Sequence, residues 1–107
     1  MHRRKPLSDL VIGKVDKDWP AWITGALEAA RLAPSAVNRQ PWKFLVENTS
    51  ITVAVSDKSL RRESVMSKRL CCGIAMLHLE VGANNFGVQG QWEFLDPPGV
   101  ARFNAEI

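Results

Sequence analysis

Cysteine, histidine and long apolar runs are all scarce in this chain of 107 residues. The two cysteines, Cys71 and Cys72, are adjacent in a predicted helix, where neighbouring side chains point in different directions. This disfavours an intrachain disulfide and a metal site in which both cysteines are ligands, so we expect both to be small core residues. No stretch approaches the ~18 apolar residues that indicate a membrane-spanning helix. We therefore expect a reduced, cytoplasmic protein with no membrane partner.

The usual signatures of nucleotide binding and hydrolysis are also missing. The seven glycines are scattered and form neither GxGxxG nor GxxxxGK. Ser35 lacks the glycine-flanked turn of a nucleophile elbow and has no histidine near it in sequence, which argues against a serine hydrolase. His78 has no second histidine or cysteine at ligand spacing, so we expect a structural histidine and no metal site. The sequence thus predicts no catalytic acid, base or nucleophile.

Positive charge is mild and concentrated in two places. The formal net charge is +3, and the basic clusters are HRRK at 2–5 and KSLRRESVMSKR at 58–69. Nucleic-acid binding usually needs a stronger basic stripe with aromatic or groove-reading elements. We therefore expect no nucleic-acid partner.

Periodicity divides the chain into an extended arm, residues 1–15, and one domain, residues 16–107. Apolar residues at helical spacing predict a helix over about 19–33, which Pro34 ends, and a second helix over about 64–86, which Gly87 ends. KFLVEN and ITVAVS predict an antiparallel hairpin, and VQGQWEFL a third strand. We expect DPPGVARFNAEI to form a turn and an irregular end. The predicted fold class is α+β, with two main helices and a small antiparallel sheet.

The second helix is apolar on most sides, which is typical of a helix that is buried on most sides. A chain of this size has little material to surround it, so we expect the fold to be completed by a second chain or domain. Gly73 and Gly82 would then be points of close helix approach, since each costs about 1 kcal/mol relative to alanine.

The decamer APSAVNRQPW, residues 33–42, leaves two interpretations open. Its prolines fix the backbone around Ser35, Asn38 and Gln40, whose hydroxyl and amide groups suit a flat heterocycle rimmed with carbonyls and ring nitrogens. The alternative is a helix stop that leads into a strand, with these polar groups bonded to their own backbone.

The run ALEAARLAPSAVNRQPWKFLV resembles the start of the flavin-dependent nitroreductase family, which has a helix, an APSxxNxQPW loop and a strand. In that family the loop lines a flavin mononucleotide (FMN) site between two subunits or two halves. The resemblance implies that Pro34, Ser35, Asn38 and Gln40 bind the cofactor. It also implies that Gln40, Pro41 and Trp42 shape the loop.

A second resemblance lies upstream. RRKPLSDLV, residues 3–11, is similar to a RKPLxExV segment that normally lies near the end of a nitroreductase, where a basic residue reaches the flavin phosphate. This order, with CGIAMLHLEVGANNFGVQGQWEFL after the hairpin, resembles the C-terminal half of a two-copy nitroreductase subgroup. Arg4 and Lys5 are then the phosphate-binding candidates. The RRSxRxF-like phosphate motif and the glycine-rich segment over the flavin ring do not occur.

The resemblance implies an oxidoreductase in which FMN passes reducing equivalents from NAD(P)H to a nitroaromatic or quinone-like acceptor. The implied partners are a second copy of the chain or a missing N-terminal half. The alternative is a truncated half that is catalytically silent and acts as a structural or dimerisation module.

Overall fold

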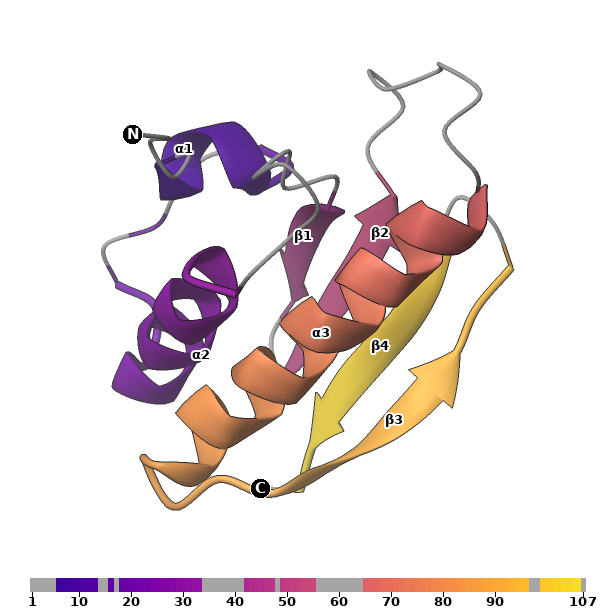
Figure 1. The fold of residues 1–107 in the computed structure, drawn as a ribbon. Coiled ribbons are helices and arrows are strands. Elements are labelled where there is room, and N and C mark those ends of the chain that lie inside the picture. The colour runs from indigo at the N-terminus through magenta and orange to yellow at the C-terminus, as the bar shows by residue number, and fades with distance from the viewer. Residues whose placement is uncertain are drawn as a thin grey trace.

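The computed structural model describes residues 6–13, 16, 18–33, 42–47, 49–55, 65–96 and 99–106, with the backbone alone for 65–71. Figure 1 shows three helices and four strands in the described parts. In chain order these are α1 (Leu7–Leu10), α2 (Ala21–Arg31), β1 (Trp42–Glu47), β2 (Ser50–Val55), α3 (Val65–Asn84), β3 (Gly90–Phe94) and β4 (Gly99–Ala105).

The four strands form one antiparallel sheet in the order β1-β2-β4-β3. The predicted hairpin is confirmed as β1 and β2, and the predicted third strand as β3. The prediction of an irregular end was wrong, because β4 inserts between β2 and β3. Its apolar residues Ala101 and Phe103 are fully buried and alternate with polar ones, which is the period-2 pattern of a half-buried strand.

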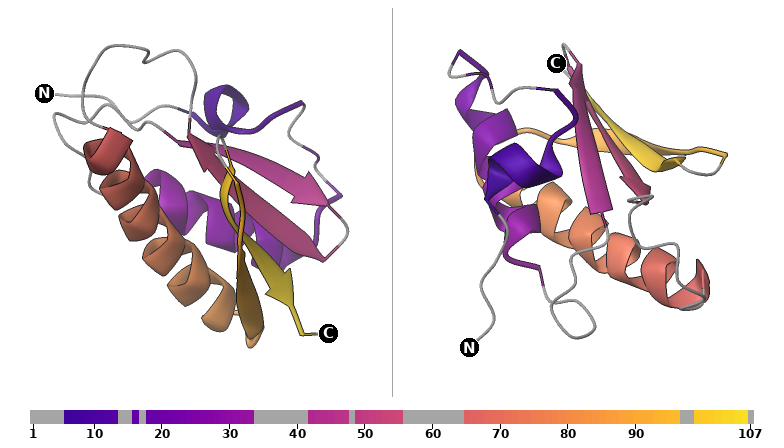
Figure 2. Two further views of the ribbon diagram at one scale, coloured as in Figure 1. Left: turned by 90° about the vertical axis from the view of Figure 1, so that its right-hand side faces the viewer. Right: turned by 90° about the horizontal axis from the view of Figure 1, so that it is seen from above.

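Helices α2 and α3 cover one face of the sheet, so the fold has two layers (Figure 2). The core lies between the layers. α3 contributes Cys72, Ala75, Leu79 and Ala83, which recur every three or four residues and are fully buried. The expectation that the cysteines pack in the core is confirmed for Cys72. Trp22 of α2 and Trp92 of β3 both pack against Phe103, with ring centroids 6.2 and 5.2 Å from it.

Helix α2 is shorter than the predicted 19–33 but lies within it. Pro20 is the residue before the helix, where a missing amide hydrogen costs nothing. The helix ends at Arg31, whose side chain pairs with Glu28 one turn earlier at 3.2 Å. Its buried side is continuous through Trp22, Ile23, Ala26, Leu27 and Ala30, as the apolar spacing predicts. None of the described helices is both long enough and apolar enough to span a membrane.

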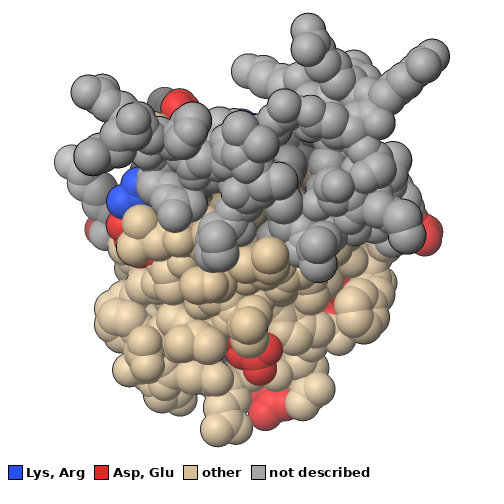
Figure 3. Space-filling model, viewed as in Figure 1, with Lys and Arg blue, Asp and Glu red and all other residues tan. Residues whose placement is uncertain are grey.

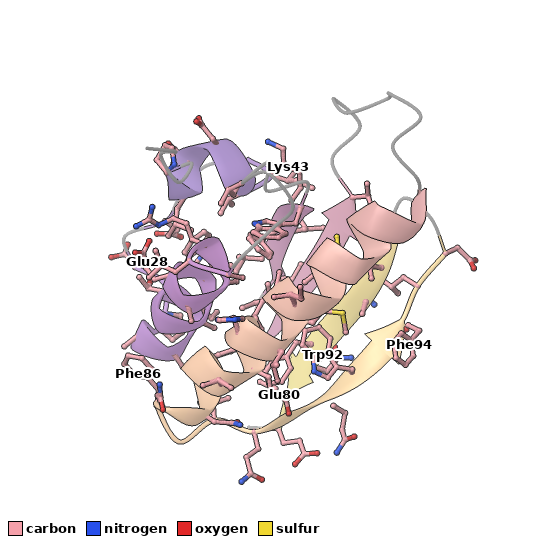
Figure 4. All side chains as sticks on the ribbon, viewed as in Figure 1. Glu28, Lys43, Glu80, Phe86, Trp92 and Phe94 are labelled. Atoms are coloured by element: carbon pink, nitrogen blue, oxygen red, sulfur yellow. The ribbon has the colours of Figure 1, made fainter. Side chains whose placement is uncertain are left out.

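The two helices cross at very close range. A Cβ placed on Gly82 of α3 would lie 2.8 Å from Ala29 Cβ and 2.9 Å from Gly25 O. A Cβ on Gly25 would lie 2.1 Å from the ring of Phe86, which follows α3 and covers that glycine (Figure 4). The prediction of close helix approach is therefore confirmed at Gly82. Gly87, with φ at 77°, is the left-handed residue that ends the helix, as the sequence predicts.

Gly73 differs from Gly82 and provides a matched test of this crossing. It is exposed, and a Cβ built there meets nothing within 4 Å.

We expect Gly82→Ala to lower the free energy of unfolding by about 1–3 kcal/mol, because its methyl group forces two backbones apart. Gly73→Ala should raise it by up to about 1 kcal/mol through helix propensity alone. Urea unfolding at submicromolar protein concentration measures both changes. Equal effects of the two substitutions would contradict the close crossing.

Candidate functional site

The segment before α2 is held against the outer edge of β1. Val11 forms a parallel bridge with Phe44, and the backbone N–H of Ile12 donates to Phe44 O at 2.7 Å. Leu10 is fully buried and Val11 is 5% exposed. The arm that resembles a family motif therefore lies along the strand that follows the decamer.

One detail of this docking differs from the expectation of an extended arm. Residues Leu7–Leu10 form one helical turn, α1, which the Val11 N–H closes by donating to Leu7 O at 2.9 Å. Lys43, the second residue of β1, donates from Nζ to the backbone oxygen of Asp9 (Figure 4). Sequence reasoning missed the role of Lys43, since nothing in the pattern shows that its neighbour on the sheet edge is the arm.

The two residues that bound segment 34–41 are both fully buried. Ala33 lies just after α2, and Trp42 begins β1. Trp42 Nε1 is buried, and no acceptor for it is found in the part of the chain that the structure describes. A buried donor without a partner costs about 1–3 kcal/mol. The start of β1 is therefore a place where an added acceptor would stabilise the protein.

All six predicted cofactor-binding residues lie outside the described residues: Arg4, Lys5, Pro34, Ser35, Asn38 and Gln40. The structure does describe the segments that follow these residues. Residues 6–12, which follow Arg4 and Lys5, lie beside β1. β1 itself begins at Trp42, at the end of the decamer. The arm and the decamer are about thirty residues apart in the sequence, yet both lead to neighbouring residues of β1.

A separate cavity of about 240 Å³ lies at the opposite end of α2 and β1. It is lined by residues just before and at the start of α2 and by the end of β1: Asp16, Trp19, Pro20, Ile23, Val46 and Glu47. The Asp16 carboxylate accepts the Asp18 N–H at 2.8 Å, a local turn bond. The cavity contains none of the residues that the sequence singles out.

Several other polar side chains in the described parts have structural contacts. Trp92 donates to Glu80 at 3.0 Å, which joins β3 to α3 (Figure 4). Arg102 joins three strands on the open face of the sheet, since it contacts Thr52 at 3.2 Å and Glu93 at 3.1 Å. His78 is half-buried on α3, and the described residues hold no group of three metal-ligating side chains.

Comparison with known protein families shows to which family the chain belongs. The family model described as "Putative TM nitroreductase" matches residues 1–83, which include the arm, the decamer and most of α3. The chain belongs to this family. The resemblance inferred from the two motifs is thereby confirmed for the nitroreductase family as a whole. A search of the curated proteins gives no significant match.

A solved structure supports the fold. The chain is similar to a crystal structure described as a "putative nitroreductase" from Thermotoga maritima, with a TM-score of 0.73 and 21% identity. The match covers 97% of this chain but 42% of that one. The protein thus has a nitroreductase-like α+β fold and spans less than half the length of that solved relative, which agrees with the predicted half-domain.

The docking of the arm depends on a backbone bond that proline can remove. Val11 has φ −90° and ψ 133°, the extended conformation that a following proline favours. Ile12 is 51% exposed, so its side chain contributes little.

We expect Ile12→Pro to lower the free energy of unfolding by about 1–3 kcal/mol, because Phe44 O loses its donor. Ile12→Ala keeps the N–H and should change the free energy by no more than about 0.5 kcal/mol. Urea unfolding and the rate of proteolytic cleavage within residues 1–13 provide the measurements. An arm that is no more sensitive to protease in Ile12→Pro than in Ile12→Ala would show that this bond does not hold it.

Proposed function

We propose that this protein is a nitroreductase-like flavoprotein module, in which FMN carries reducing equivalents from NAD(P)H to a nitroaromatic or quinone-like acceptor. The observation that carries the proposal is the docking of the arm on β1 through Val11 and Phe44. The residues that follow the basic segment pair with the start of β1, and the decamer ends at the same place, although about thirty residues separate the two segments. Family membership over residues 1–83 supports the same conclusion.

The residues of the decamer have the chemistry that a flavin ring needs. The Ser35 hydroxyl and the amides of Asn38 and Gln40 can donate to ring carbonyls and accept from a ring N–H. Pro34 restricts the backbone beside them. The Trp42 N–H at the start of β1 has no acceptor among the described residues, which fits a loop whose polar contacts are completed by a bound group. The flavin supplies the redox chemistry when it is bound, and the protein positions it and tunes it by hydrogen bonds.

Arg4 and Lys5 are proposed to bind the FMN phosphate. Both carry fixed positive charge at neutral pH and directly precede Pro6, the first described residue of the docked arm. The nicotinamide and the acceptor need no residue of this chain as a general acid or nucleophile, because the flavin accepts and donates the electrons. The cytoplasmic setting expected from the sequence belongs to this proposal.

One alternative has its own support. The chain spans 42% of its solved relative, and large apolar side chains of α3 are exposed, including Leu77 at 61%. A half of a nitroreductase that is silent alone and active when paired would have both features. Flavin binding by the isolated chain separates the two functions.

The first test concerns the flavin ring. Purified protein incubated with FMN and then desalted should retain flavin absorbance, and Asn38→Ala should weaken FMN binding about tenfold, because one ring contact is lost. Asn85→Ala removes an exposed amide just after α3 and should leave affinity unchanged. Quenching of flavin fluorescence measures each dissociation constant. Wild-type protein that remains colourless would contradict the proposal for the isolated chain and favour the silent half.

The second test concerns the phosphate. Wild-type protein should bind FMN more tightly than riboflavin, which has the same ring and no phosphate. Lys5→Gln should reduce this preference about tenfold and leave riboflavin affinity unchanged, because a charge-assisted bond to phosphate is worth about 1.5–3 kcal/mol. If Lys5→Gln weakens both ligands equally, Lys5 does not bind the phosphate.

A further inference from the structure

The cavity between the start of α2 and the end of β1 has an apolar interior and a charged rim. Ile23 is 1% exposed, and the half-buried side chains of Trp19 and Val46 pack against the same core. The carboxylates of Asp16 and Glu47, which are both exposed residues, belong to the same lining. An apolar pocket with a few convergent polar groups is the usual form of a small-molecule site. We call this space the Trp19 cavity.

A turn before α2 holds Asp16 and Trp19 in a fixed relation. Asp16 Oδ1 accepts the Asp18 N–H at 2.8 Å, and the Asp16 backbone oxygen accepts the Trp19 N–H at 3.4 Å. The second carboxylate oxygen of Asp16 has no bonded partner among the described residues, and neither has the Glu47 carboxylate. Both groups can therefore accept hydrogen bonds from a ligand.

The part of the chain that the structure describes has few cations that could neutralise these two carboxylates. Arg31, Lys43 and Arg102 are the lysine and arginine side chains that it describes. Each contacts a group elsewhere, respectively a glutamate one turn away, a backbone oxygen of α1 and the polar side chains on the open face of the sheet. The described surface in Figure 3 likewise shows several acidic groups and little lysine or arginine. None of the three cations lines the Trp19 cavity.

The chemistry of the lining distinguishes between classes of ligand. Two carboxylates disfavour an anion, and Asp16 already meets the preference of the α2 N-terminus for negative charge. A neutral apolar ligand would make no use of the carboxylates. An organic cation uses every part of the lining. Its charged head can bond to the carboxylates and contact the indole ring, while its apolar part covers Ile23 and Val46.

We propose that the Trp19 cavity binds a small organic cation, a primary ammonium that carries a short apolar chain. The volume of about 240 Å³ lies below the ~300–1,000 Å³ of pockets for drug-sized ligands, so the ligand is small. The cavity lies at the other end of α2 and β1 from the decamer. The site is therefore separate from the proposed flavin site and does not depend on it.

The test uses the full chain without flavin, with n-hexylammonium as the probe. n-Hexanol has the same chain without the charge and is the matched neutral ligand. In titrations followed by two-dimensional NMR at about 0.15 M NaCl, where long-range charge effects are screened, shifts should be confined to residues around the cavity. We expect n-hexylammonium to bind about tenfold more tightly than n-hexanol, because only the cation gains the carboxylate and indole contacts.

Glu47→Gln keeps the size of the side chain and removes its charge. It should weaken n-hexylammonium binding about fivefold, the upper range for one exposed ion pair, and leave n-hexanol binding unchanged. Folding should not be affected, since Glu47 is exposed, and circular dichroism checks this. Asp96→Asn is the control, because it makes the same charge change at an exposed residue just after β3, on the opposite edge of the sheet. It should bind both probes like the wild type.

Trp19→Leu tests the indole and should also weaken n-hexylammonium binding about fivefold. The inference is overturned by equal affinity for the two probes, by equal behaviour of Glu47→Gln and Asp96→Asn, or by shifts that spread over many exposed carboxylates. The outcome is independent of the proposed function. Cation binding in a protein that retains no flavin supports the inference while the proposed function fails, and FMN binding without cation binding gives the reverse result.

Discussion

The rest of the structure depends on the contact in which Gly82 of α3 lies directly against the backbone of α2. At Gly82 the backbone of α2 lies closer than a Cβ would permit, and the ring of Phe86 covers Gly25 at the same range. Both helices lie on the same side of the four-stranded sheet and share one core with it (Figure 2). α3 fills that core with alanine, Cys72 and Leu79, α2 adds Trp22, Ile23 and Leu27, and the strands add large aromatic rings. The mostly small buried residues of α3 are therefore complementary to the larger side chains of α2 and of the strands.

The elements that the sequence predicts well are those whose pattern is local. The two helices and the hairpin follow from apolar spacing, from Pro34 and from the left-handed Gly87. β4 was missed because its inward side chains include Ala101, which is small, and because two prolines precede it. Its position between β2 and β3 is a long-range property that no window of sequence contains. The same holds for Lys43, whose contact with Asp9 spans 34 residues.

The candidate site was predicted from two motifs, and the structure contributes their relation to each other. Composition and spacing leave the decamer with two interpretations of equal standing, since proline and polar residues suit both a helix stop and a binding loop. The docked arm favours the binding loop, because a second segment that resembles a family motif lies on the strand that follows the decamer. The residues proposed to touch the flavin lie outside the described parts, so their roles rest on chemistry and family membership.

The central position of β4 has a consequence for how the protein is made. Residues up to Phe94 are synthesised before β4, yet β2 and β3 have no hydrogen-bonded connection until β4 lies between them. Until β4 is in place, the hairpin therefore presents an unpaired edge at β2, and Trp22 and Trp92 lack the Phe103 ring that both contact in the folded protein. Unpaired strand edges and exposed aromatic rings favour aggregation. The nascent chain is thus most vulnerable just before its last described strand emerges, and changes in β4 should appear first as poor solubility.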